Sequence, residues 1–372
     1  MRALLFETRT GQPVVDLERT AWSCDTGILA PDKLDLTIPA YTPRARSMDM
    51  RDLLTPYRHS IALIDETVED EPVVAAAGPI VQVSTSQDDD GKDTWKVTCY
   101  GPERLLESRH IRLFPGWPLI DAGGLPTGAY DMNLTGLQYG TIMKRLVHES
   151  EKWPGGELPI VFEIDRPGTR VRNYAAIDGK PVADALDELA DMQNGVEYDF
   201  HPIVNDLDEI AWLFQTGTDT NRTITGPREP VWNLGGASQD VRGYERTLSP
   251  AEVATETFFT GGKDGDRVMI ARAVDTTLTD AGWPRVEVWD SSHSSVSIQT
   301  TLQGWADGRL GGPTERIRFE VRRDQAHRLR HGDNAMLQAQ GHWDMPDGEH
   351  WWRVLSVSHR SSSPDWVGVQ LV

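Results

Sequence analysis

Two histidines, His327 and His331, are spaced so that they could bind one metal ion together. Residues four positions apart on a helix lie on one face, and zinc proteases place two imidazole ligands in this way. The intervening residues are Arg328, Leu329 and Arg330, so the glutamate that follows the first histidine in the zinc-protease signature is missing. The two arginines would also repel a divalent cation. We therefore expect both histidines to be polar loop residues and predict no metal site.

Cys24 and Cys99 are the only cysteines in the chain. A thiol hydrolase needs a cysteine with a lowered pKa, often at the start of a helix, together with a histidine. Cys99 instead belongs to the alternating stretch 95–100, which is typical of a strand. We expect it to be a small core residue. Two cysteines are too few for a disulfide framework or a thiolate metal site, which fits assembly in a reducing cytoplasm.

Signatures of other enzymes are missing from the sequence. No nucleophile elbow, phosphate-binding glycine loop or dinucleotide fingerprint occurs between a strand and a helix. Paired carboxylates give no information, because 57 Asp and Glu residues guarantee that some lie close together by chance. We therefore predict a protein that is not an enzyme and has no cofactor, with a cell-wall hydrolase as the second alternative.

The 13 tryptophans suggest binding surfaces of two kinds. Trp351 and Trp352 are neighbours in an alternating stretch, so at least one of them is expected to face solvent or a partner. Flat aromatic faces stack on sugars, and exposed aromatic side chains also anchor protein interfaces. We favour the interface and keep a glycan-binding receptor module as the first alternative.

The acidic composition limits the classes of partner. The formal net charge is -20, whereas a surface that binds phosphate backbones needs clustered Lys and Arg. We therefore expect no nucleic-acid binding. If the protein lines a channel for DNA, its acidic surface would keep the DNA from adhering as it passes. Solubility is the simpler explanation of the negative charge. The first residues resemble no signal peptide, and no apolar run approaches the roughly 20 residues that cross a bilayer. We expect neither secretion nor membrane insertion.

The N-terminal 100 residues carry the signals of short strands. The strands are expected at residues 3–7, 34–38, 60–64, 79–84 and 94–99. Asp88, Asp89, Asp90 and Gly91 lie between two alternating stretches and predict a hairpin loop. A calcium loop is the other reading of these residues, but the alternating ligands that end in a bidentate glutamate are missing.

The middle of the chain mixes helices and strands. Helical spacing occurs at residues 101–109, 135–151 and 181–193, and residues 300–310 are also compatible with a short helix. The Pro- and Gly-rich stretch 114–128 predicts a surface excursion. Alternation at 196–200 and 210–214 predicts a hairpin on which the helix at 181–193 packs.

The C-terminal part again predicts mostly short strands. These are expected at residues 258–260, 267–271, 286–289, 295–299, 316–321, 335–339, 351–357 and 366–371. A chain of 372 residues is longer than a single hydrophobic core usually supports, so more than one domain is expected. We therefore divide the chain into a first β-barrel (1–100), a helical and loop connector (101–156), an α+β domain (157–230) and a second β-barrel with insertions (231–372).

The two β-rich ends resemble each other weakly, and repeats of this kind decide architecture. The first copy runs through Tyr57-Arg58-His59-Ser60-Ile61-Ala62-Leu63, Gly78-Pro79-Ile80-Val81-Gln82-Val83-Ser84 and Trp95-Lys96-Val97-Thr98. The second runs through Leu329-Arg330-His331-Gly332-Asp333-Asn334-Ala335-Met336-Leu337, Trp352-Arg353-Val354-Leu355-Ser356-Val357-Ser358 and Trp366-Val367-Gly368-Val369-Gln370. Each copy is a strand, a loop and a two-stranded hairpin. We predict a mainly β protein with an α+β portion, in which two related small β-barrels bracket a helix-plus-hairpin middle domain; independent β domains remain the alternative.

In this order of elements the sequence resembles the baseplate hub proteins of contractile-tailed phages and the N-terminal hub module of tail-associated minor tail proteins in long-tailed phages. The likeness rests on Tyr100-Gly101-Pro102-Glu103-Arg104-Leu105-Leu106-Glu107-Ser108-Arg109 after the first barrel, on Asn194-Gly195-Val196-Glu197-Tyr198-Asp199-Phe200 between helix and hairpin, and on the closing barrel at 330–372. The order of these pieces carries the resemblance, because each alone is unspecific.

The resemblance implies a virion structural protein of the phage tail tip, assembled in the host cytoplasm. Three chains with two barrels each would present six near-equivalent faces and so join a six-fold tail ring to a three-fold spike. The implied partners are two further copies of the chain, the distal tail ring protein and a tail spike or fibre protein, with the tape measure protein as a further candidate. DNA would only pass through the channel during ejection. Because the chain ends after the second barrel, we expect any hydrolase activity to lie in another protein.

Overall fold

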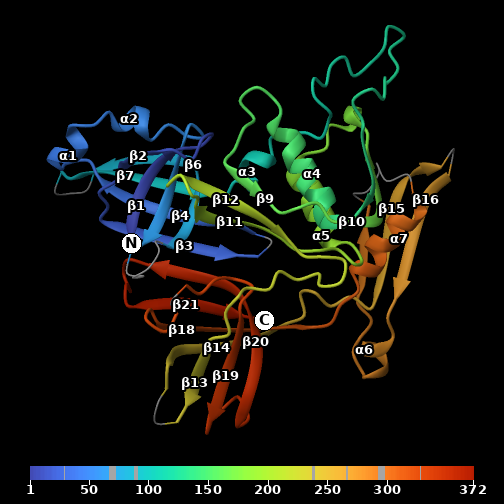
Figure 1. The fold of residues 1–372 in the computed structure, drawn as a ribbon. Helices are drawn as coiled ribbons and strands as arrows, with labels where there is room; N and C mark the ends of the chain where they lie inside the picture. Colours follow the sequence, from blue (N-terminus) through green and yellow to red (C-terminus); the bar gives the residue numbers. More distant parts are fainter. Residues whose placement is uncertain are drawn as a thin grey trace.

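The computed structural model describes residues 1–28, 30–66, 73–87, 91–236, 239–264, 267–291, 298–326 and 328–372. It is mainly β with mostly antiparallel sheets, which confirms the expected class (Figure 1). The hairpin turn expected at Asp88, Asp89 and Asp90, residue His327, and residues 295–297 of the strand expected at 295–299 lie outside the described residues. Among the helices of the described ranges, none has the length and apolar character needed to span a bilayer.

The N-terminal β unit contains seven strands and two short helices. The strands are β1 (Arg2–Glu7), β2 (Pro13–Asp16), β3 (Ala21–Gly27), β4 (Ala30–Pro39), β5 (His59–Asp65), β6 (Val73–Gln87) and β7 (Asp93–Tyr100), and the helices are α1 (Pro43–Arg46) and α2 (Met50–Leu53). Their order in the sheet is β3-β4-β7-β6-β5-β1-β2. Strand β6 is long enough to pair twice: residues 73–79 pair with β5, and residues 80–87 pair with β7. The unit folds over so that β1, β3 and β4 share one apolar core.

The C-terminal β unit repeats this plan. Its strands are β13 (Val231–Gly235), β14 (Val241–Ser249), β18 (Thr314–Arg322), β19 (Asn334–Gln340), β20 (Gly348–Arg360) and β21 (Trp366–Leu371). Their order in the sheet is β14-β18-β21-β20-β19-β13. Strand β20 also pairs twice, first with β19 and then with β21. A separate core of this unit is built around Trp232 and Phe319, whose ring centroids lie 5.5 Å apart.

The two units match strand by strand once β2 is left out. The chain order β1, β3, β4, β5, β6, β7 corresponds to β13, β14, β18, β19, β20, β21, and the order in the sheet is also the same. Even the irregularity is shared, because the register of β6 on β7 shifts between Ile80 and Gln82, and that of β20 on β21 shifts between Val354 and Ser356. One difference is that β1 runs antiparallel to β5, whereas β13 runs parallel to β19. The internal similarity seen in the sequence therefore reflects a repeated topology.

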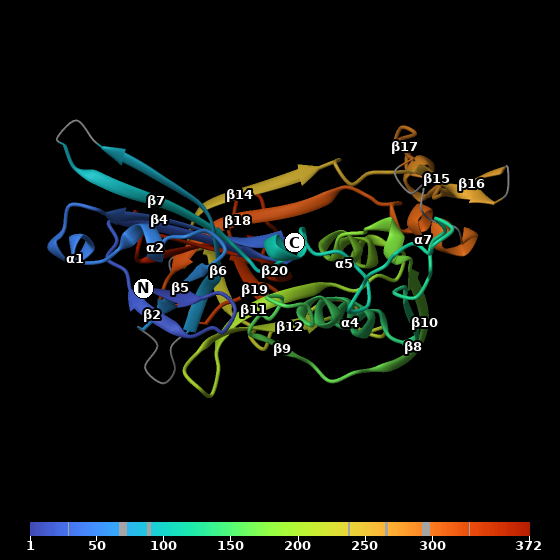
Figure 2. The ribbon, with the colours of Figure 1, turned by 90° about the horizontal axis from the view of Figure 1, so that it is seen from above.

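The two units are joined edge to edge in one sheet. The second half of β20 pairs antiparallel with β3, with Val357 opposite Thr26 and Ser358 opposite Asp25. In the described part of the chain, the main path of strand pairs is open, with β14 at one end and β2 at the other, and no pairing closes a barrel. Figure 2 shows the β6–β7 hairpin extending toward one end of the molecule, whereas the β14–β18 pair extends the other way, toward the inserted elements β15, β16 and α7.

The middle of the chain lies between the two units in sequence and beside them in space (Figure 1). Its elements are α3 (Glu103–Leu106), β8 (Met132–Leu137), α4 (Tyr139–Glu151), β9 (Ile160–Phe162), β10 (Pro167–Tyr174), η1 (Ala176–Asp178), α5 (Val182–Asp191), β11 (Tyr198–Val204) and β12 (Ile210–Thr216). Helix α5 and the β11–β12 hairpin confirm the helix-plus-hairpin prediction. The helix expected from Thr135 was wrong at its start, because residues 132–137 pair with β10.

A small β sheet with helices is inserted between β14 and β18. It consists of β15 (Glu256–Asp264), β16 (Arg267–Val274), α6 (Thr277–Asp280), β17 (Glu287–Asp290) and α7 (Gln299–Gly308). Helix α7 confirms the helix expected at 300–310, and Leu302 and Trp305 on it pack on the inserted sheet. The strand expected at 295–299 was wrong at its last residue, because Gln299 begins α7.

Candidate functional site

The residues singled out in the sequence occupy different places in the fold. Cys99 is fully buried in β7, and burial raises the pKa of its thiol far above the ordinary value, so the thiol stays protonated. Trp351 is 56% exposed on β20, whereas Trp352 packs against the core of the C-terminal unit. This confirms that one of the two tryptophans faces outward. His331 lies in the loop before β19, but it is only 4% exposed and therefore not a surface loop residue.

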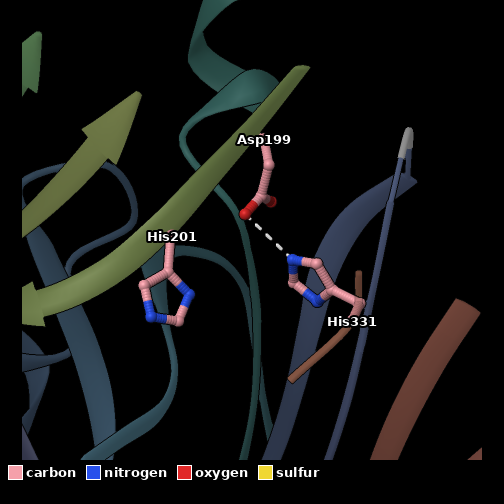
Figure 3. A group of neighbouring side chains, drawn as sticks. All are labelled: Asp199, His201 and His331. Atoms are coloured by element: carbon pink, nitrogen blue, oxygen red, sulfur yellow. Dashed lines mark ion pairs between the residues drawn. The ribbon is translucent and has the colours of Figure 1, made fainter. Parts of the chain in front are cut away.

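His331 meets two residues of strand β11. Asp199 and His201 are two positions apart on this strand, so both side chains lie on one face of it. Nε2 of His331 lies 2.9 Å from Oδ2 of Asp199, and both side chains are buried (Figure 3). The ring of His201 meets that of His331 edge to face, with centroids 6.4 Å apart. Sequence reasoning missed Asp199 and His201; the available signal was that they form the polar face of an alternating strand.

A cavity of about 390 Å³ borders this group. Its lining includes Asp32 of β4 as well as His201 and His331, so all three parts of the fold contribute to it. Burial raises the pKa of Asp32 to about 8 and lowers that of His201 to about 4. Burial is the largest single effect on the pKa of His331 and lowers it, but Asp199 and Asp32 together outweigh burial, so the net shift is upward. Imidazole and carboxylate groups in this arrangement can exchange protons or bind a cation.

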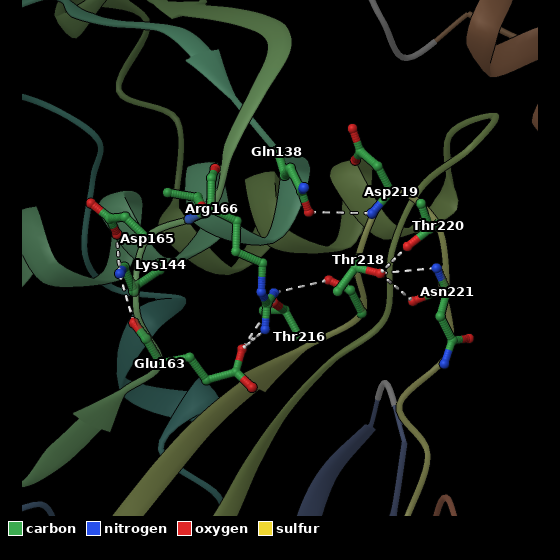
Figure 4. A network of polar contacts seen from close by, with 12 residues as sticks. Gln138, Lys144, Glu163, Asp165, Arg166, Thr216, Thr218, Asp219, Thr220 and Asn221 are labelled. Atoms are coloured by element: carbon green, nitrogen blue, oxygen red, sulfur yellow. Dashed lines mark hydrogen bonds and ion pairs between the residues drawn. The ribbon is translucent and has the colours of Figure 1, made fainter.

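A second polar group gathers around Arg166, at the start of β10, and Lys144 of helix α4. Arg166 donates to Oε2 of Glu163 at 2.5 Å and to Oγ1 of Thr216 at 3.0 Å, while Lys144 donates to the carbonyl oxygen of Glu163 at 2.7 Å and also pairs with Asp165 (Figure 4). These contacts tie α4 to the segment between β9 and β10 and to the end of β12. Because the charges neutralise one another, we interpret the group as a structural network.

Two strand edges are the other candidate sites. Within the described ranges, the outer edge of β14 pairs with no strand, and residues 81–87 of β6 pair only with β7. The β6 stretch from Val81 to Gln87 contains no charged residue, and Leu248 on β14 is 60% exposed. Natural proteins usually protect long free edges with charges or bulges, because unpaired backbone groups bind other strands. An uncharged edge of this length therefore indicates a binding surface.

Comparison with known proteins identifies the fold. No protein-family model matches the chain, and no curated protein matches it either. Among solved structures, a tail protein from Neisseria meningitidis matches with a TM-score of 0.54 at 13% identity, covering 100% of this chain and 96% of that one. The 43 kDa tail protein of prophage MuSo2 from Shewanella oneidensis matches with a TM-score of 0.56 at 12% identity, covering 100% and 98%. A chain of the Francisella PdpA–VgrG complex matches with a TM-score of 0.52 at 8% identity, covering 100% of this chain and 57% of that one.

The chain thus has the fold of phage tail proteins over its whole length. This agrees with the resemblance found in the sequence. Both of these neighbours are described as tail proteins, which fits the prediction of a structural protein.

Proposed function

We propose that this protein is the structural hub of a phage tail tip or baseplate, that it forms a homotrimer, and that the ring joins a six-fold tail tube to a three-fold spike or fibre. The observation that carries the proposal is the repeated six-strand order with its shared register shift. Three chains with two such units each supply six similar faces, which a six-fold partner needs. The shared fold with phage tail proteins supports the same role.

The junction between the two units suggests how copies join. Within the chain, the second half of β20 pairs with β3. The corresponding strands of the other unit are β6 and β14, and these lie at opposite ends of the path β14-β18-β21-β20-β3-β4-β7-β6. They are separated by seven strand spacings, or about 34 Å along the sheet. The equivalent junction is therefore proposed to form between β6 of one copy and β14 of the next, which closes a ring head to tail.

The repeat also fixes the register of this proposed junction. Gln82 and Ser356 both follow the register shift, so Ser84 corresponds to Ser358, which lies opposite Asp25. In the N-terminal unit, the pairing of β7 with β4 and of β4 with β3 leads to Asp25. In the C-terminal unit, the pairing of β21 with β18 and of β18 with β14 leads to Thr247, so these two residues occupy equivalent positions. Ser84 should then lie opposite Thr247 of the neighbouring copy. Val83 should lie opposite Leu248, so the exposed leucine would be covered.

The partners and location follow from this role. We propose that the hub contacts the distal tail ring protein on one side and a spike or fibre on the other, with the tape measure protein as a further partner. The net charge of -20 favours a channel wall along which DNA passes without binding. The protein would act in host attachment and DNA ejection from the virion tail tip, after assembly in the host cytoplasm, and without catalysis.

A glycan-binding receptor module is the second candidate function. It is favoured by an exposed aromatic group at the far end of the C-terminal unit. Trp343 is 82% exposed, its ring lies 5.6 Å from that of His342, and Tyr244 lies 6.3 Å from it edge to face. Flat exposed rings of this kind stack on sugars as well as on protein partners.

Native mass spectrometry of the purified chain distinguishes the two functions. We expect a species of three times the 41.5 kDa chain mass at micromolar concentration. A stable monomer that binds sugars on a glycan array would refute the hub and support the receptor module.

A further inference from the structure

We propose that Asp199, His201 and His331 form a binding site for a divalent transition metal ion, with Zn²⁺ as the best fit. The ion would be structural: it would link strand β11 of the middle domain to the loop before β19 of the C-terminal unit. This inference goes beyond the proposed hub function, because a hub could form with or without such an ion.

The donor atoms are already gathered. One ligand atom from each of the three residues can be chosen so that all lie within 4.8 Å of one another. Tetrahedral zinc with bonds of about 2.0–2.1 Å needs ligand atoms about 3.3 Å apart, so modest side-chain rotations would bring them to a shared ion. Figure 3 shows His201 and Asp199 on one strand, with His331 facing them across a gap.

One ring nitrogen of His331 has no hydrogen-bond partner in the structure. The side chain is 4% exposed, and its Nδ1 is buried without a hydrogen-bond partner. A buried polar atom with no partner costs about 1–3 kcal/mol, so such atoms are rare unless they bind something. A metal ion bound at Nδ1 would remove this deficit.

The surrounding charge favours a cation. Asp199 is 7% exposed and Asp32 is 8% exposed, and both face His331. Glu103 is also close to Asp32 and Asp199, and its Oε2 is buried without a hydrogen-bond partner. Burial favours the protonated form of the Asp32 and Glu103 carboxyls, and a divalent ion would give these groups and the Asp199 carboxylate a charged partner. Arg330 opposes this effect, since it acts on both histidines.

The ligand chemistry selects the class of ion. Two imidazoles with one carboxylate is a donor set used for zinc and related transition metals, whereas magnesium and calcium prefer oxygen ligands. Asp32 lines the same cavity as His201 and His331, so its carboxylate or a water molecule in the cavity is available as the fourth ligand. The His327–His331 pair considered in the sequence would have required a helix, whereas His331 lies in a loop.

The test uses the full-length chain without a polyhistidine tag, because a tag would bind the same ions. After dialysis against Zn²⁺ and gel filtration, elemental analysis should find about one Zn²⁺ per chain. His201→Gln and His331→Gln should reduce this to background. His359→Gln is the matched control, because His359 lines the same cavity but is not part of the cluster; it should retain one Zn²⁺ per chain.

Co²⁺ binding gives a readout that does not depend on the variants folding. The wild-type chain with Co²⁺ should show the d–d absorption of a four-coordinate site with nitrogen ligands, and an equimolar amount of Zn²⁺ should abolish it. Wild-type protein that binds no Zn²⁺ and gives no such absorption would overturn the proposal. Binding that survives in both ligand variants would also overturn it. The oligomeric state is measured separately, so failure here leaves the hub proposal standing.

Discussion

Leu248→Asp should convert the proposed trimer into monomers while leaving the fold of each chain intact. Leu248 is 60% exposed on the outer edge of β14, so the chain itself loses little when it is changed. In the proposed ring the Leu248 side chain is covered by Val83 of the next copy. A carboxylate at this position would be buried without a charged partner and would lose its hydration. This cost is several kcal/mol per junction, and about 3 kcal/mol already weakens association more than about a hundredfold.

Native mass spectrometry and analytical ultracentrifugation would measure this loss. Val83→Asp on the opposite strand should also prevent the ring from forming, but it should lower the stability of the chain as well, because Val83 packs against the N-terminal core. Circular dichroism should show that Leu248→Asp remains folded. Val268→Asp is the matched control, because Val268 is similarly exposed, at 58%, but lies on β16 of the inserted sheet. Trimers that persist in both edge variants would exclude this junction.

Arg353→Ala should cause the largest loss of stability among substitutions of charged side chains. Arg353 donates to Oε1 of Glu197 at 2.7 Å, to Oε2 at 2.5 Å and to the carbonyl oxygen of Ile224 at 2.8 Å. The two charged side chains are only 19% and 18% exposed, and they join the middle domain to β20. Removing the arginine leaves the Glu197 carboxylate buried without its partner, which costs about 3–5 kcal/mol.

Chemical unfolding followed by two spectroscopic probes would measure the change in the free energy of unfolding. The double variant Arg353→Met with Glu197→Met should recover much of the loss, because it removes both charges. Arg360→Ala is the control: its contact with Asp25 is 4.0 Å long and about half exposed, so the change should cost less than about 1 kcal/mol. Equal losses for Arg353→Ala and Arg360→Ala would show that the buried pair does not hold the two parts together.

Strands that separate core from solvent were predictable from the sequence. In β4, Leu34, Leu36 and Ile38 are buried and alternate with less buried residues, and β18 shows the same pattern at Ile317, Phe319 and Val321. One face of each strand is buried, so apolar residues are required at every second position, and this alternation is visible in the sequence. The repeat was visible for the same reason, since both copies bury corresponding positions.

Sequence reasoning missed β3, which forms the junction with β20, and β14, which is proposed to form the equivalent junction between copies. Strand β14 buries only Val241, and strand β3 carries Asp25 between two polar or small neighbours. These strands are held in the sheet by backbone hydrogen bonds to other strands. Because every residue type offers nearly the same backbone groups, the side-chain pattern does not reveal this pairing. The Asp199–His331 contact was also hidden, because it joins residues on a strand and a loop that are far apart along the chain.

Disulfide trapping across the proposed junction tests the hub arrangement most directly. Ser84→Cys combined with Thr247→Cys should give covalently closed trimers on mild oxidation, and the native Cys24 and Cys99 should not interfere because both are fully buried. Ser84→Cys combined with Arg242→Cys should trap little, because position 242 lies five residues, or about 17 Å, further along β14. Chains that remain uncrosslinked monomers, or that are trapped equally well in both combinations, would contradict a ring closed through β6 and β14.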